Sequence, residues 1–330
     1  MPWFSIIVPA LNEEKYLPLL IDSVFKQRYR PIELIVADEG STDGTAQLTR
    51  NLAAQLNGKD FRIVRVTDES CSGKPRGPAY ARNLGISKAS GTYVLLLDAD
   101  YILSDSNILS QLAAALEPEP AARFQAETVA DNWLGRNLAL DDRNPTFRWA
   151  RRGLVSGRAF RMEVLKRFQF DSSLGAGEDK DFLTRVTAAG VPMTATIAAR
   201  GVRRIPCTLT ALWRQREWYG RTILLYLRKY HSLRDLTELL PPIPFLLFVG
   251  TAVLLLFSTQ LAFVSASAFA AIVLLAIARS PHRSASRIAY IVLVRLLYCP
   301  LSFFVGLMLG LAQMAIRGSI NRSRDSYVRP

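Results

Sequence analysis

Cysteine is scarce in this sequence. Its 330 residues include three cysteines, Cys71, Cys207 and Cys299, which lie far apart and form no Cys-x-x-Cys pair. This spacing predicts neither a disulfide framework nor a cysteine-based zinc site, and it fits a reducing compartment. A signal peptide is not expected either, because the apolar run from Trp3 to Leu11 is short and leads directly into Asn12-Glu13-Glu14.

Two common nucleotide-binding motifs are also absent. No Gly-x-Gly-x-x-Gly follows the first apolar run, and no Gly-x-x-x-x-Gly-Lys-[Ser/Thr] occurs anywhere in the chain. The sequence therefore predicts neither a dinucleotide-binding oxidoreductase nor a P-loop NTPase.

Charge is missing from one long segment, since residues 244–278 contain no Asp, Glu, Lys or Arg. Residues 1–199 carry 24 Lys and Arg against 24 Asp and Glu, so the formal excess of +13 lies entirely in the second half of the chain. There the cations flank apolar runs. This arrangement favours contact with anionic lipids and disfavours a nucleic-acid partner.

The first half alternates short apolar runs with segments of helical spacing. Strands are predicted at 5–9, 32–37, 61–66 and 93–97, with helices at 16–27, 46–56 and 78–89 between them. This order predicts βαβ units and an α/β fold with a mostly parallel sheet. Less regular elements are expected next, namely a helix at 104–116, strands at 123–128 and 154–160, and a helix that begins near Glu178-Asp179.

Two carboxylates follow the strand predicted at 93–97. In an extended chain Asp98 and Asp100 would point the same way. Ligands of parallel sheets bind outside the carboxyl ends of the strands. Paired carboxylates there are suited to Mg²⁺ or Mn²⁺. The alternative for Asp-Ala-Asp by itself is a solvated turn.

Four motifs in order resemble the GT-A type family 2 glycosyltransferases. They are Ile6-Ile-Val-Pro9 with Asn12-Glu13, Asp38-Glu-Gly-Ser-Thr-Asp-Gly-Thr45, Ala81-Arg-Asn-Leu-Gly85 and Asp98-Ala-Asp100. Glu178-Asp179 is similar to the family's acidic pair in the acceptor region. The resemblance covers about residues 3–190 and extends to membrane-integral members, such as polyprenyl- and dolichyl-phosphate mannose synthases, and distantly to cellulose synthase.

The resemblance implies a nucleotide-sugar site and a divalent ion, Mn²⁺ or Mg²⁺. By this resemblance Asp98 and Asp100 would bind the metal, and Arg82 would lie near the nucleotide. The implied nucleotide-sugar residues are Pro9, Ala10, Asn12, Glu13, Asp38, Glu39, Gly40, Ser41, Arg82, Asp98, Ala99 and Asp100. Glu39 departs from the family pattern, which often has a second Asp there.

Asp179 is the implied general base, with Glu178 beside it. A hydroxyl acceptor requires such a base because its own pKa is far above neutral pH. A phosphate monoester does not, since its second pKa is about 6. The alternative for these acidic residues is a favourable interaction with a helix N-terminus.

The second half is predicted to bind a membrane. Residues 209–230 interleave aromatic and basic residues at helical spacing, which favours an interfacial helix over an ordinary surface helix. Its proposed acceptor and interface residues are Arg214, Arg216, Trp218 and Arg221. Three transmembrane helices are predicted at about 244–259, 261–279 and 292–316. A fourth span and a buried helical core are the alternatives.

The predicted organisation is therefore a cytoplasmic catalytic domain at 1–200, interfacial helices at 201–243, a transmembrane domain at 244–316 and a basic tail at 317–330. The positive-inside rule favours the cytoplasmic side. The altered order of Trp213-Arg-Gln-Arg-Glu-Trp-Tyr219, compared with the family's Gln-x-x-Arg-Trp, disfavours processive synthesis.

The predicted activity is an inverting, metal-dependent transfer of a hexose. The favoured donor is GDP-mannose, and the favoured acceptor is dolichyl or polyprenyl phosphate. One alternative is extension of a lipid-linked oligosaccharide or glycolipid from a UDP- or GDP-sugar. The other is a non-catalytic membrane scaffold.

Overall fold

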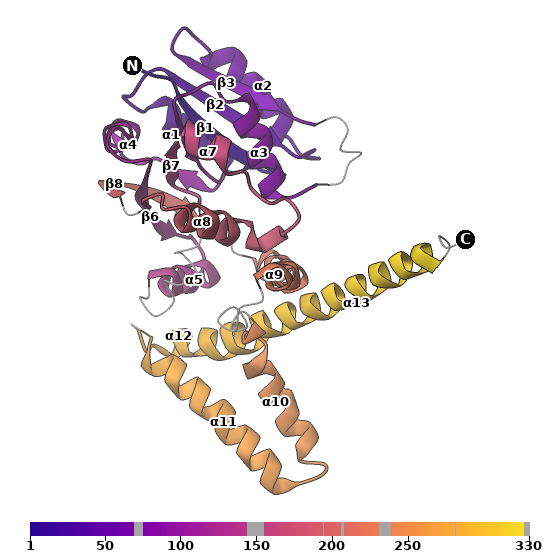
Figure 1. Ribbon diagram of the computed structural model, residues 1–330. Coiled ribbons are helices and arrows are strands. Elements are labelled where there is room, and N and C mark those ends of the chain that lie inside the picture. The colour runs from indigo at the N-terminus through magenta and orange to yellow at the C-terminus, as the bar shows by residue number, and fades with distance from the viewer. Residues whose placement is uncertain are drawn as a thin grey trace. The chain divides into compact units, whose positions relative to one another are not determined.

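A computed structural model describes residues 1–68, 75–143, 155–193, 195–205, 208–230, 239–280 and 282–326. Cys71, Cys207 and Leu154 lie outside these ranges. The chain forms two compact units (Figure 1). The sheet unit comprises Met1–Ala130, Trp149–Ser173 and Glu178–Ile205, and the helical unit comprises Asp131–Arg148, Leu174–Gly177 and Pro206–Pro330.

The sheet unit contains one eight-stranded sheet in the order β3-β2-β1-β4-β7-β6-β8-β5. Its strands are β1 (Phe4–Ala10), β2 (Ile32–Asp38), β3 (Phe61–Val66), β4 (Tyr93–Leu96), β5 (Tyr101–Ile102), β6 (Ala121–Val129), β7 (Arg158–Arg161) and β8 (Ala195–Arg204). The first four strands pair in parallel, and β7 runs antiparallel to both β4 and β6. The mostly parallel α/β fold is confirmed.

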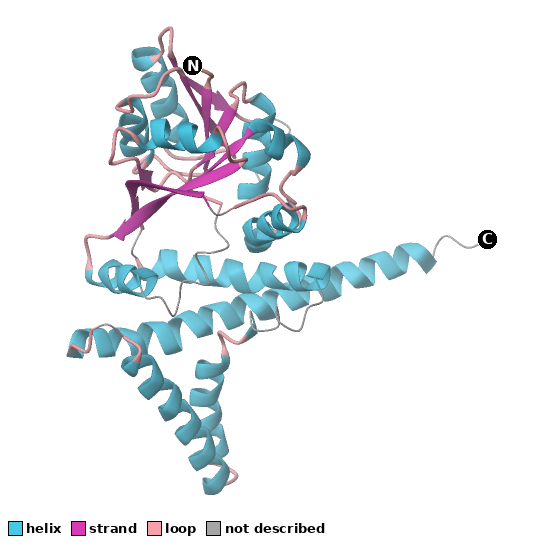
Figure 2. Cartoon of the chain, turned by 60° about the vertical axis from the view of Figure 1, so that its left-hand side comes forward, coloured by secondary structure: helices cyan, strands magenta, loops and turns pink. Residues whose placement is uncertain are grey.

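Helices cover both faces of this sheet (Figure 2). They are α1 (Leu17–Phe25), α2 (Thr45–Leu56), α3 (Pro78–Lys88), α4 (Ile108–Leu116), α7 (Met162–Arg167) and α8 (Glu178–Ala188). Successive residues of β1 face opposite sides, so Ile6 joins the core cluster that contains residues of α1 and α4, while Ile7 joins the one that contains residues of α7 and α8. Central strands with both faces covered are apolar throughout, which explains their continuous hydrophobic runs.

Two predicted boundaries in this unit are wrong. The helix expected from Ser104 begins at Ile108, because the Asp105 carboxylate accepts a hydrogen bond from the backbone of Asn107 and holds a turn there. The strand expected at 154–160 begins only at Arg158, after Gly157 adopts φ +80°. Strands β5 and β8 were not predicted.

The helical unit contains α5 (Trp133–Arg143), η2 (Gly175–Gly177), α9 (Leu209–Tyr230), α10 (Ile243–Leu254), α11 (Thr259–Ala278), α12 (Ala285–Ala289), the π-helical η4 (Tyr290–Tyr298) and α13 (Cys299–Ser326). Helices α10 and α11 pack as a hairpin, in which Ser258 caps α11 by accepting a hydrogen bond from the backbone of Leu261. By length and composition, two stretches of the described residues could cross a membrane, Thr259–Ala278 and Ala285–Ala315.

Candidate active site

The loops after β1 and β2 are joined at the carboxyl edge of the sheet. Asn12 adopts φ +59°, and its side-chain oxygen accepts a hydrogen bond of 2.8 Å from the backbone of Thr42. The backbone of Glu13 donates to Oγ1 of Thr45 at 2.8 Å. Gly40 allows the second loop to turn with φ +85°. Strands β1 and β2 thus present one continuous polar rim.

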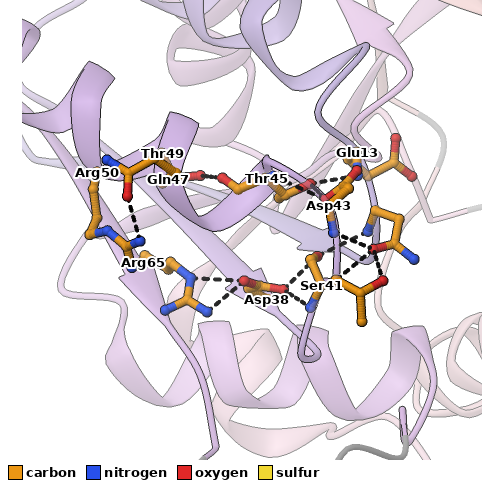
Figure 3. Close-up of polar contacts among 11 residues, drawn as sticks. Glu13, Asp38, Ser41, Asp43, Thr45, Gln47, Thr49, Arg50 and Arg65 are labelled. Atoms are coloured by element: carbon orange, nitrogen blue, oxygen red, sulfur yellow. Dashed lines mark hydrogen bonds and ion pairs between the residues drawn. The ribbon is translucent and has the colours of Figure 1, made fainter.

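Asp38 is buried under this rim, between Ser41 and Arg65 (Figure 3). Its Oδ1 accepts hydrogen bonds from the backbone and the hydroxyl of Ser41, at 2.9 and 2.7 Å, and its Oδ2 pairs with Arg65 at 2.6 Å. Burial acts to raise the pKa of Asp38, but these bonds together hold it below its usual value. The carboxylate therefore remains charged and supports the loop. Its place among the nucleotide-sugar residues stays a prediction.

A small pocket lies beside Asp38. It is lined by Asp38, Glu39, Asp68, Pro75, Arg76, Tyr80 and Leu84. The Arg76 guanidinium lies 4.6 Å from the centre of the Tyr80 ring, and the Arg76 backbone donates to Glu39 at 3.1 Å. A planar cation, an aromatic face and carboxylate acceptors are the groups that recognise a heterocyclic base. Of the predicted nucleotide-sugar residues, Asp38 and Glu39 line this pocket.

Arg82 joins the metal motif to the acidic pair. From α3 it donates to Oδ1 of Asp98 at 3.0 Å, to Oε1 of Glu178 at 3.2 Å and to Oδ1 of Asp179 at 2.9 Å. Its side chain is 4% exposed. We call these four residues the Arg82 cluster. One cation faces three carboxylates, so the cluster has a net negative charge when all three are ionised.

Asp98 and Asp100 lie in a turn and not in an extended strand. Strand β4 ends at Leu96, and the backbone of Tyr101 donates to the carbonyl of Asp98 at 3.2 Å. The alternation argument for their direction is therefore wrong. Each binds a different arginine, Asp98 binding Arg82, while Asp100 pairs with Arg203 of β8 at 3.0 Å.

The charges of Asp98 and Asp100 nevertheless both affect the pKa of the same neighbouring acid, Glu13. Burial raises the pKa of Glu13 to about 7, and the charges of Asp100, Asp98 and Asp43 add to the shift. Burial also raises the pKa of Asp100. The charge of the neighbouring Arg203 acts to lower this pKa, and the charge of Asp98 adds to the rise. A site in which acids raise one another's pKa values favours a cation or a proton.

These carboxylates fit a divalent metal ion. Oδ1 of Asp100 is buried without a hydrogen-bond partner among the described residues, and so is Oε2 of Glu178. A buried carboxylate oxygen without a donor is costly, and a hard cation is its natural partner. Asp98 and Asp100 would hold such an ion. Within the described ranges no group of three or more His, Cys, Asp or Glu forms a complete protein cage, so substrate oxygens or water would complete its coordination.

Glu178 and Asp179 open α8 from the first turn of the helix. Burial raises the pKa of Glu178 to about 8, with the Asp179 charge adding to it. Burial likewise raises the pKa of Asp179, whose Oδ2 accepts a hydrogen bond from the backbone of Val155 at 3.1 Å. The third acid, Asp181, pairs with Arg185 at 2.7 Å and is fully buried, so its role is structural.

Several contacts of this site were missed at the level of sequence. Arg203 binds Asp100 from 103 residues away, Arg65 binds Asp38, and the Ser156 hydroxyl accepts a bond of 2.8 Å from the Asp98 backbone. Of these residues, only Arg65 had a feature in the sequence that indicated a place at the site, because it is a polar residue one position before the end of β3. Two predicted residues have buried side chains instead, since Ala10 and Ala99 pack in the core.

The predicted acceptor residues belong to the helical unit. Arg214, Arg216, Trp218 and Arg221 all lie on α9. The Arg216 guanidinium lies 5.9 Å from the centre of the Tyr219 ring, and Arg221 pairs with Glu217. The Trp218 ring also lies 5.4 Å from the Tyr219 ring, between centres, so three of the four are engaged within their own helix.

Comparison with known proteins gives a family match. The model of "Glycosyl transferase family 2" matches residues 5–169. An uncharacterized glycosyltransferase of Haemophilus influenzae is 38% identical over 117 residues, which are 36% of this chain and 44% of that protein. A "PGL/p-HBAD biosynthesis glycosyltransferase" of Mycobacterium bovis is 34% identical over 149 residues, covering 45% of this chain and 50% of its own. The matched region thus spans about half the length of these relatives.

One similar solved structure covers most of the chain. It is a mannosyltransferase from Pyrobaculum calidifontis in complex with GDP-Man and Mn²⁺. The TM-score is 0.56 at 20% identity, with 94% of this chain and 87% of the other covered. At this identity the similarity supports the GT-A fold.

Proposed function

This chain belongs to glycosyl transferase family 2, and from that premise we propose that it transfers a hexose from a nucleotide sugar to a membrane lipid. The favoured donor is GDP-mannose, and the favoured acceptor is dolichyl or polyprenyl phosphate. The observation that carries the proposal is the carboxylate site itself, in which Asp98 lies near Asp100, whose Oδ1 has no hydrogen-bond partner among the residues that the structure describes and could bind a cation.

The charge of the leaving group explains why such a site is useful. A nucleoside diphosphate gains negative charge as the sugar departs, and a divalent ion held by Asp98 and Asp100 would supply electrostatic stabilisation there. The protein's own part is positional. Arg82 fixes the direction of Asp98, and Arg203 fixes that of Asp100.

Asp179 is the proposed general base, with Glu178 beside it. Burial has raised the pKa of both acids, and a base whose pKa is near the working pH is the most effective. A base acting on the acceptor hydroxyl would assist its attack on the face opposite the leaving group, and the configuration at the anomeric carbon would be inverted.

A membrane lipid is proposed as the acceptor because of the helical unit. Thr259–Ala278 is long and apolar enough to enter a bilayer, and α9 interleaves Arg and aromatic side chains as interfacial helices do. The excess of Arg beside these segments favours a position of the catalytic domain on the cytoplasmic side of the membrane.

A second candidate follows from the presence of the base. A phosphate acceptor has no need of Asp179, whereas a hydroxyl acceptor does. The buried and hydrogen-bonded Asp179 therefore favours extension of a lipid-linked oligosaccharide or glycolipid as the alternative.

The test is a donor and acceptor screen with the full chain in detergent. GDP-mannose, UDP-glucose and UDP-N-acetylglucosamine are each offered with a polyprenyl phosphate or a glycolipid, with and without Mn²⁺. Product from GDP-mannose and the lipid phosphate supports the first candidate. Turnover of UDP-sugars alone contradicts the donor, and no transfer to any lipid contradicts the acceptor class.

Two variants separate the acceptors. Asp100→Asn is expected to abolish transfer to both acceptors because it removes a metal ligand. Asp179→Asn is expected to lower kcat by about 10²–10⁴-fold with the hydroxyl acceptor and much less with the phosphate. Equal losses with both acceptors would contradict the base assignment.

A further inference from the structure

The apolar stretch Ala285–Ala315 has polar partners along most of its length. Arg287 is 1% exposed and donates to the carbonyl of Asn137 at 2.7 Å and to the Asp141 carboxylate of α5. The Tyr290 hydroxyl donates to Asp141 at 2.9 Å, and Arg295 pairs with the same acid at 3.4 Å. Helix α5 thus accompanies residues 287–295.

Helix α9 accompanies the next part. The Tyr298 hydroxyl donates to the carbonyl of Leu209 at 2.8 Å. Further along, a Cβ on Gly306 would collide with the carbonyl of Glu217, and one on Gly310 would lie 2.5 Å from the carbonyl of Arg221. The two helices therefore run in the same direction and in close contact, with residues 209–221 beside residues 298–310.

The partners of this stretch include charged residues, and their contacts extend along most of its length. Residues 287–310 extend over about 35 Å of helix at 1.5 Å per residue, which exceeds a hydrocarbon core of about 30 Å. Were this stretch to cross the bilayer, Asp141 and the charged residues of α9 would have to enter it as well. Charged side chains inside a membrane are rare and costly. The packing therefore favours a position along the membrane surface.

The hairpin of α10 and α11 is much less covered by the rest of the protein. Of the most apolar 18-residue window in α11 only 6% is buried within the protein, against 39% in the stretch from Ala285 to Ala315. The hairpin tip is exposed and apolar, with Leu255, Leu256 and Phe257 exposed by 58, 81 and 80%. No Trp, Tyr or charged residue occurs between 244 and 278 to hold this tip at a second interface.

The reach of the hairpin is also limited. Its first arm, α10 from Ile243 to Leu254, measures about 18 Å at 1.5 Å per residue. The far end of α11 is occupied by packing, since Ala276 lies in one cluster with Leu134, Leu212 and Tyr290. About 18 Å is deeper than one leaflet but short of the whole hydrocarbon core of about 30 Å.

We propose that the helical unit is embedded from one side of the bilayer and that none of its segments crosses it. The hairpin dips into the hydrocarbon and ends there, while α9, α12, η4 and α13 lie along the surface. This replaces the three predicted spans and keeps the basic tail on the side of the sheet unit. The inference rests on the membrane association proposed above.

Cysteine labelling tests this topology. In a background with Cys71, Cys207 and Cys299 replaced by Ser, single cysteines are introduced as Lys59→Cys in the sheet unit, Leu256→Cys at the hairpin tip and Asp325→Cys in the tail. Membranes of a bacterial expression host are prepared as inverted and as right-side-out vesicles and treated with a membrane-impermeant maleimide. Variants that lose donor binding in detergent are replaced by Phe257→Cys or Ser323→Cys.

The expected result is that the Lys59→Cys and Asp325→Cys proteins are labelled in the same vesicle preparation, and that the Leu256→Cys protein is labelled only after detergent is added. Tail labelling from the face opposite Lys59→Cys would establish a crossing and overturn the inference. Tip labelling from that opposite face would do the same. Release of the protein from membranes by alkaline carbonate contradicts the proposed membrane association instead, so the two failures are distinguishable.

Discussion

Arg82 offers the sharpest test of the site's electrostatics. Its guanidinium binds Asp98, Glu178 and Asp179 within 3.2 Å, and its side chain is 4% exposed. Replacing it in Arg82→Met keeps much of its volume and removes the only cation in the Arg82 cluster. Removing one partner of a buried ion pair costs about 3–5 kcal/mol, because the remaining charge is left uncompensated. At roughly 2–4 °C per kcal/mol for a domain of this size, the melting temperature should fall by about 10 °C.

The loss should depend on pH, in a direction that follows from the acids. Without Arg82 the folded-state pKa values of Glu178 and Asp179 rise further above those of the unfolded chain. An acid with a raised folded pKa is destabilising while it is ionised, above that pKa, and the penalty disappears as falling pH protonates it. The difference between the variant and the original chain should therefore be largest near pH 8.5 and shrink toward pH 5.5.

The assay is thermal unfolding of the full chain in detergent with EDTA present. Arg50→Met is the matched control, because Arg50 is exposed on α2 and donates a hydrogen bond to the neighbouring Gln47, so little change is expected at either pH. Adding Asp179→Asn to Arg82→Met should recover roughly 1–3 kcal/mol, the size of typical couplings between contacting residues. An equal loss at both pH values, with no recovery in the double variant, would refute the reasoning.

Three further outcomes are expected. Arg203→Met removes the donor that orients Asp100 and should lower Mn²⁺ affinity by about 10–100-fold, whereas Arg50→Met should leave the titration unchanged. Mn²⁺ affinity should rise between about pH 6 and about pH 8 as Glu13, with its pKa of about 7, loses its proton, and Glu13→Gln should flatten that dependence in the same calorimetric titration. Gly220→Ala should cost about 1–3 kcal/mol in detergent melts, because a Cβ there would collide with the carbonyl of Phe303, while Gly250→Ala meets only Ser265 at 4.0 Å and should be neutral.

The parallel half of the sheet was predictable because residues adjacent in the sequence determine where its strands begin and end. Strands such as Ile32–Asp38 are apolar on both faces, and each is followed by Gly, Asp or Ser residues that stop a strand and start a helix. The motif that contains Asp38 and Ser41 identified the rim of the site for the same reason. Helix Leu209–Tyr230 was predicted to the residue from its aromatic and basic spacing.

The remaining features depend on distant contacts. Strand β8 contains Arg200, Arg203 and Arg204 and is largely part-buried or exposed, so its sequence resembles a polar loop. Its position beside β5 and β6 is what brings Arg203 to Asp100. The direction of Asp98 was likewise set by Arg82 and not by the strand that precedes it. Near the span predicted at about 292–316, Arg287 contacts polar groups of α5 that lie some 150 residues earlier in the chain, so the composition of this segment could not reveal them.

The helical unit is assembled from three separate stretches of chain, and this has a practical consequence. Helix α5 and the turn at Gly175–Gly177 are inserted within the part of the sequence that builds the sheet, yet they pack with the C-terminal helices, as Leu134 does in the cluster with Leu212 and Tyr290. A recombinant fragment that stops after β8 would retain both insertions but lose the C-terminal helices that they pack against. Leu134 and its neighbours would then be solvent-exposed apolar surface, and such a fragment would be prone to aggregate.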